Sequence, residues 1–152
     1  MIMTELKEKL RTDLTAAMKG RDELVTATLR MALTAIGNEE VAGKEARELS
    51  DAEVVQVLTR EAKKRREAAE AFADGGRPEQ AEREKAEGEV LARYLPAQLS
   101  DEELNALVAQ AIAETGAEGP KGMGLVMKAL NPKIAGRAEG GRVAAAVKAA
   151  LA

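Results

Sequence analysis

The chain has 152 residues, with 23 Lys and Arg against 26 Asp and Glu and a formal net charge of −3 at pH 7. It contains no cysteine, histidine or tryptophan, and one tyrosine and one phenylalanine. These absences exclude a disulfide framework, a zinc site of cysteine or histidine ligands, a cysteine nucleophile and a Ser-His-Asp triad. We expect a soluble cytoplasmic protein, because no segment has the length of a membrane span and residues 1–14 lack a signal peptide's apolar core.

The composition predicts an all-α fold, since alanine, leucine, glutamate, lysine and arginine dominate and alternating apolar and polar residues are absent. The first predicted helix spans about 5–19, with Thr4 as its cap and Gly20 as its end. A second helix starts near Asp22 and is apolar on two faces, which predicts a central position. Arg30 lies within it and needs a polar partner or an exit to solvent.

Two helix starts carry the same capping signal. Residues 49–54 and 99–104 each place a serine before the helix, a glutamate three residues later and apolar residues on both sides. The serine side chain can accept a hydrogen bond from a free helix amide while the glutamate reaches back to the serine amide. We therefore predict helices that begin at Asp51 and at Asp101.

The helix from Asp51 to about Phe72 is expected to pair with a helix over about 79–95 as a long antiparallel hairpin. The outer end of this hairpin consists almost entirely of polar residues and alanine, so we expect that end to be poorly buried. Pro96 then marks the best domain boundary, which predicts an N-terminal helical domain over 1–95.

The second predicted domain, over 99–152, is a small C-terminal three-helix basic domain. Its helices are expected over about 101–114, over 123–130 with Asn131 and Pro132 closing it, and from about 139–141 to 151.

No catalytic residue, metal site or cofactor is predicted. The adjacent carboxylates Asp51 with Glu53 and Glu102 with Glu103 are explained by their places at helix amino termini. The glycine-rich segments 119–124 and 136–143 lack the residues and the preceding strand of a phosphate loop. The basic run 63–66 wraps around its helix, so a solvated, salt-bridged helix is favoured over a binding patch.

Charge is distributed unevenly along the chain. Residues 1–119 carry 17 basic and 25 acidic residues, whereas residues 120–152 carry six basic residues and one acidic residue. A basic segment on an acidic helical body suggests an anionic partner, recognised by shape and phosphate contacts because stacking aromatics are missing. The candidate nucleic-acid-binding residues are Lys121, Lys128, Lys133, Arg137, Arg142 and Lys148.

The chain resembles the GatB/YqeY family, which includes free-standing bacterial proteins and the tail domain of the B subunit of glutamine-dependent aminoacyl-tRNA amidotransferase. The resemblance is carried by TLRM at 28–31, AIGNE at 35–39, EAKKRREA at 61–68, YLPAQLS at 94–100, and MG at 123–124 with VM at 126–127 through PKIAGRA at 132–138. Two positions depart from the family pattern, Glu139 in place of Asp and Gly37 in place of Lys. The resemblance implies two helical domains and tRNA as the partner class.

Three hypotheses for the function follow. The first is an accessory module that recognises tRNA shape through the six basic residues and performs no catalysis of its own. The second is an interaction subunit that docks on an amidotransferase or another tRNA enzyme, which apolar exposure over 123–130 would favour. The third, a carbon–nitrogen ligase with glutamine as amido donor, follows from the family label alone.

Overall fold

The computed structural model describes residues 5–152, which form seven α-helices and one short 3-10 helix and contain no strand. The predicted all-α class is therefore confirmed. Thr4, the predicted cap of the first helix, lies outside the described residues. The chain divides into two compact units, Met1–Leu95 and Pro96–Ala152, and each has a hydrophobic core of its own.

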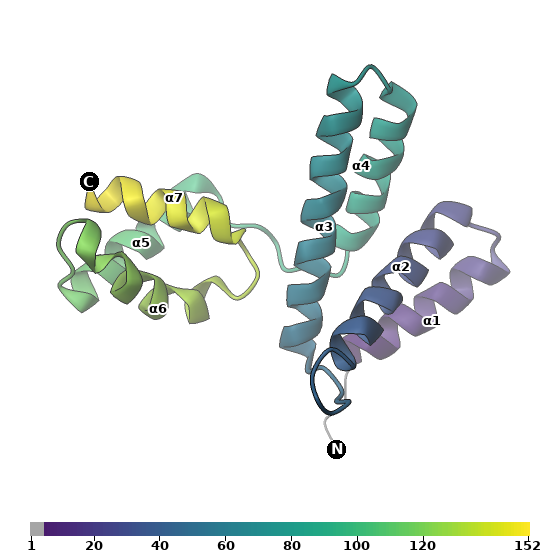
Figure 1. Ribbon diagram of the computed structural model, residues 1–152, viewed down its shortest axis with the longest axis horizontal. Coiled ribbons are helices and arrows are strands. Elements are labelled where there is room, and N and C mark those ends of the chain that lie inside the picture. Colours follow the sequence, from purple (N-terminus) through teal and green to yellow (C-terminus); the bar gives the residue numbers. More distant parts are fainter. Residues whose placement is uncertain (1–4) are drawn as a thin grey trace. The chain divides into compact units, whose positions relative to one another are not determined.

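The first unit contains α1 (Glu5–Lys19), α2 (Glu23–Glu40), α3 (Asp51–Asp74) and α4 (Pro78–Ala92). α3 and α4 lie side by side as an antiparallel hairpin (Figure 1). α2 packs against α1, α3 and α4. The central position predicted for it is therefore confirmed.

The core of this unit lies where all four helices meet. Leu10 from α1, Leu29 and Ile36 from α2, Leu58 from α3 and Leu91 from α4 are completely buried there. Further along the hairpin, residues 73–80 are all exposed, which agrees with the expectation of a poorly buried outer end. In the intervening stretch Arg65 joins the two helices through ion pairs with Glu84 at 3.2 Å and Glu87 at 3.6 Å.

Both predicted capping boxes are confirmed. The Glu53 amide donates to the Ser50 hydroxyl oxygen at 3.3 Å, and the Ser50 amide donates back to the Glu53 carboxylate at 3.1 Å. The same reciprocal bonds join Ser100 and Glu103, at 3.0 Å in each direction. Apolar residues on both sides of each box are buried, so the entry of the chain into α3 and α5 is fixed as the sequence predicts.

The end of α1 differs in detail from the prediction. The left-handed residue that turns the chain is Arg21, with φ 55°, and not Gly20. The Asp22 amide donates to the Ala17 carbonyl at 2.9 Å and the Arg21 amide donates to the Met18 carbonyl at 3.2 Å, a Schellman arrangement. Gly20 continues the helical hydrogen bonding instead, since its amide donates to the Ala16 carbonyl.

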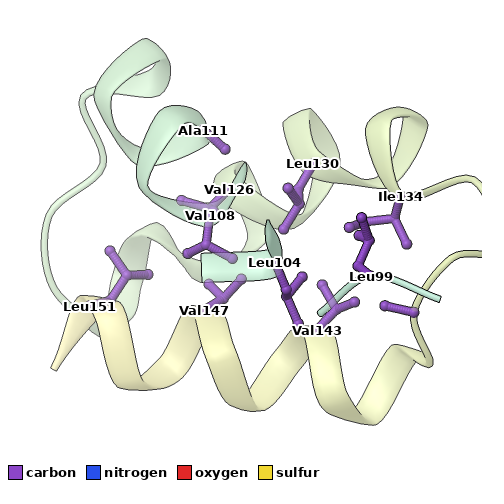
Figure 2. Close-up of a cluster of buried hydrophobic side chains, with 11 residues drawn as sticks. Leu99, Leu104, Val108, Ala111, Val126, Leu130, Ile134, Val143, Val147 and Leu151 are labelled. Atoms are coloured by element: carbon purple, nitrogen blue, oxygen red, sulfur yellow. The ribbon is translucent and has the colours of Figure 1, made fainter. Parts of the chain in front are cut away.

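The second unit contains α5 (Asp101–Thr115), the 3-10 helix η1 (Pro120–Gly122), α6 (Met123–Ile134) and α7 (Gly140–Leu151). Figure 2 shows side chains from all three α-helices meeting in one core. Leu104 and Val108 come from α5, Leu130 from α6 and Val147 from α7, and all are at least 98% buried.

The prediction that Asn131 and Pro132 close the sixth helix is wrong. α6 runs through Pro132 to Ile134, and the left-handed Ala135 with φ 44° ends it. Proline in the last turn removes one amide donor. Burial of Ile134, which is 5% exposed, favours the extra turn.

Candidate nucleic-acid interface

Charges are segregated within the second unit. Residues 96–119 hold five acidic residues and no basic one, whereas residues 120–152 hold six basic residues and one acidic residue. The two halves cancel, so the unit as a whole carries no net charge. The description "basic" therefore fits η1, α6 and α7 but not the whole domain predicted from the sequence.

Two of the six candidate residues form ion pairs with carboxylates of α5. The Lys133 ammonium lies 3.1 Å from the Glu114 carboxylate, and the Arg142 guanidinium lies 2.8 Å from the Asp101 carboxylate. These pairs tie α6 to the carboxyl end of α5 and α7 to its amino end. Both side chains keep about a third of their surface exposed, at 34% and 33%. An RNA phosphate would have to compete with a carboxylate at each of them.

The Arg137 side chain hydrogen-bonds to backbone carbonyls rather than to a carboxylate. Its guanidinium donates to the carbonyls of Lys133 at 2.6 Å and Ile134 at 3.3 Å, at the carboxyl end of α6. These carbonyls lack partners within the helix, and a cation at this end also meets the negative pole of the helix dipole. Arg137 also has a smaller effect on Glu103, whose pKa is lowered first by hydrogen bonds from the Ser100 amide and hydroxyl and then by the Arg137 charge.

The other three candidates, Lys121, Lys128 and Lys148, are exposed and have no ion pair within residues 5–152. Lys128 lies on the exposed side of α6, opposite its buried side, with Gly124, Leu125, Asn131 and Pro132, and the exposed Lys121 lies in η1, directly before this helix. We call these six exposed residues the outer face of α6.

The outer face of α6 combines positive charge with one apolar side chain. Leu125 is 53% exposed and is one of the few large apolar residues on the surface of the described chain. No acidic residue occurs between Gly119 and Ala138. Lys148 lies on a different helix, in the carboxyl half of α7, which packs against η1.

The sequence did not reveal which cations would be paired. Glu114 and Lys133 are 19 residues apart, and Asp101 and Arg142 are 41 residues apart. Both pairs depend on how the helices pack. The only available signal was that all charges of α5 are acidic, so any cation facing that helix would find a partner there.

The basic run of α3 is engaged with carboxylates. Lys63 pairs with Glu67 at 3.9 Å and Lys64 with Glu61 at 3.5 Å, while Arg65 forms the pairs with α4 described above. This agrees with the interpretation of the run as a salt-bridged helix. Within residues 5–152 no group of acidic side chains is arranged to hold a metal ion. No helix in the same range is long and apolar enough to cross a membrane.

Comparison with known families decides where the chain belongs. The family described as "Yqey-like protein" matches residues 7–151. The chain belongs to the YqeY-like family. The match covers nearly all of both helical units of this YqeY-like chain, including the outer face of α6. No curated protein matches it.

Proposed function

We propose that this YqeY-like protein is an accessory tRNA-binding module with no catalysis of its own. In this proposal the outer face of α6, together with Lys148, contacts RNA phosphates. The observation that carries it is the set of three exposed lysines, Lys121, Lys128 and Lys148, without ion pairs among the described residues, on a segment with a single acidic residue. The class of RNA comes from the family resemblance and is part of the proposal.

The ion pairs of Lys133 and Arg142 reduce the number of predicted nucleic-acid-binding residues that are available to a phosphate. A phosphate gains less from a cation that already holds a carboxylate, because that pair must first open. Arg137 is committed to the end of α6. We therefore place the main phosphate contacts at the three unpaired lysines and expect the other three residues to contribute through structure or through the wider positive field.

The salt dependence of tRNA binding tests this assignment. Lys121→Ala/Lys128→Ala/Lys148→Ala should weaken binding and reduce the steepness of log K against log salt by about 2–3, since each lost phosphate contact removes about 0.7–0.9. The matched control is Lys19→Ala/Lys44→Ala/Lys85→Ala, which removes the same charge from exposed positions of the first unit. Equal effects of the two triple variants, or no effect of the first, would reject the proposed contact surface.

A protein partner is the second candidate, and the exposure of Leu125 favours it. An exposed apolar side chain with a lysine before and after it in sequence suits a small protein interface, in which Leu125 would be buried at the centre and the lysines would lie at the polar rim. Leu125→Gln keeps all charges and removes the apolar contact. If docking on a tRNA enzyme is the function, this variant should lose capture of that enzyme after nuclease treatment. If phosphate contact is the function, tRNA binding should be unchanged.

A further inference from the structure

A second, separate feature lies in the first unit, at the turn between α1 and α2. An open cavity of about 360 Å³ is lined there by Met18, Arg21, Glu23, Thr26 and Arg30. Glu23, Thr26 and Arg30 follow each other at helical spacing along α2, while Met18 and Arg21 come from the end of α1 and the turn. This volume is within the range of small-ligand sites.

Two guanidinium groups line the cavity without a carboxylate partner. Neither Arg21 nor Arg30 forms an ion pair with any residue in the range 5–152. The Arg30 Nη2 atom lies 3.8 Å from the Met18 sulfur, so the side chain reaches from α2 to the end of α1. The Thr26 hydroxyl makes no hydrogen bond to another described residue, whereas the Thr28 hydroxyl donates to the Leu24 carbonyl at 2.8 Å. Both guanidinium groups are exposed to solvent, so an anion could reach them without breaking an ion pair.

The one acidic residue that lines the cavity already has a cationic partner. The Arg83 guanidinium of α4 donates to both oxygens of Glu23, at 2.7 and 3.0 Å. The pair is bidentate but exposed to solvent, with the Glu23 side chain 74% exposed, so Arg83 offsets the charge of Glu23 only in part. The negative charge of Glu23 therefore opposes an incoming anion less than a free carboxylate would.

Arg21 occupies a position that suits glycine. Its φ of 55° lies in the left-handed region, which costs a residue with a side chain roughly 1–2 kcal/mol. The neighbouring residue, Gly20, does not have a positive φ, so the glycine of this turn is not at the left-handed position. A strained residue that carries a charged side chain into a cavity indicates a role beyond the turn itself.

We propose that this cavity binds a phosphoryl group, with Arg21, Arg30 and the Thr26 hydroxyl as donors. The lining combines two guanidinium groups and a hydroxyl, and this many donors suits a phosphoryl group, which has more acceptor oxygens than a carboxylate. The inference does not depend on the proposed RNA contact of the second unit, since its ligand is a small anion.

The test is a titration of the full chain with inorganic phosphate at constant ionic strength, followed by amide chemical shifts. Arg30→Gln should weaken phosphate binding about tenfold, as the loss of one charge-assisted contact predicts. Glu23→Gln should strengthen it. Lys19→Gln removes a neighbouring exposed charge that does not line the cavity, and should leave the affinity unchanged.

Arg21→Gly separates ligand binding from folding. It should weaken phosphate binding about tenfold and at the same time raise Tm by about 2–4 °C, because glycine relieves the left-handed strain. A structural role alone predicts the rise in Tm without the change in affinity. A parallel titration with a nucleoside 5′-monophosphate shows which molecule carries the phosphoryl group. Tighter binding of the ester than of phosphate would mean that the nucleoside also contacts the cavity, whereas equal binding would identify the ligand as free phosphate. Phosphate binding no tighter than acetate binding, or unaltered in the Arg30 and Arg21 variants, would overturn the proposal.

Discussion

The Tyr94 hydroxyl donates a hydrogen bond of 2.5 Å to the Asp13 carboxylate. The bond joins α1 to the chain directly after α4, and the Lys9 ammonium lies 5.5 Å from the centre of the same ring. Burial raises the pKa of Tyr94, and the hydrogen bond to Asp13 and its negative charge raise it further, so the phenol stays protonated. This contact anchors the last turn of the first unit on the helix that begins it.

Replacing Tyr94 by phenylalanine tests the strength of this anchor. Tyr94→Phe leaves the half-buried Asp13 carboxylate without its donor, and we expect a loss of about 1–2 kcal/mol in the free energy of unfolding. Urea denaturation of the full chain measures it. Asp13→Ala and the double variant complete a cycle, and a coupling energy near zero would show that the bond contributes nothing.

The buried ion pair of Lys7 and Glu40 is the main polar contact between α1 and α2. Its two charged atoms are 2.8 Å apart, and the side chains are 8% and 14% exposed. The Leu49 amide also donates to Glu40, at 3.2 Å. Lys7→Ala leaves a largely buried carboxylate unpaired, so we expect a loss of about 2 kcal/mol at neutral pH. Lys19→Ala, an exposed lysine of the same helix, provides the comparison in the same denaturation experiment.

The contribution of this pair should depend on pH. Burial acts to raise the pKa of Glu40, but hydrogen bonds from Lys7 and the Leu49 amide outweigh it, and the net effect is a lowered pKa. Because the pKa of Glu40 is lower in the folded state, its ionised carboxylate stabilises the fold at pH values above the ordinary pKa of 4.5. This stabilisation is lost as the pH falls through the lowered pKa of the folded state. In the Lys7→Ala variant the Glu40 carboxylate has lost its ion-pair partner. The difference in unfolding free energy between the wild type and Lys7→Ala should therefore shrink below about pH 4.5. A constant difference down to acid unfolding would contradict the assignment.

Local signals predicted more of this structure than non-local ones. The capping boxes at Ser50 and Ser100 depend on residues three positions apart, and both form as expected. The pairing of Lys133 with Glu114 depends on how α6 packs against α5, which no short pattern encodes. Local patterns do not indicate Arg21 or Pro132 for another reason. Arg21 adopts a left-handed backbone conformation that its residue type disfavours, and Pro132 lies inside a helix although it has no amide to donate, so tertiary contacts must compensate.

The two capping boxes offer a test of whether the two units unfold separately. Ser50→Ala and Ser100→Ala should each cost about 1 kcal/mol, because each removes the acceptor for a free helix amide. If the units are independent, hydrogen exchange should accelerate in residues 5–95 for the first variant and in residues 96–151 for the second. Acceleration across the whole chain in both variants would show one cooperative structure instead.

Two helix-associated glycines should respond to alanine with opposite signs. Gly88 lies inside α4, where an added methyl group would meet the Arg65 Cβ atom at 3.6 Å, an ordinary contact. Gly88→Ala should therefore stabilise the first unit by about 0.5–1 kcal/mol through helix propensity. At Gly122 the same methyl group would lie 2.6 Å from the Ala117 Cβ atom, so η1 must move away from the loop before it. Gly122→Ala should lower Tm while Gly88→Ala raises it in thermal unfolding, and a rise in both would show that η1 accommodates the methyl group.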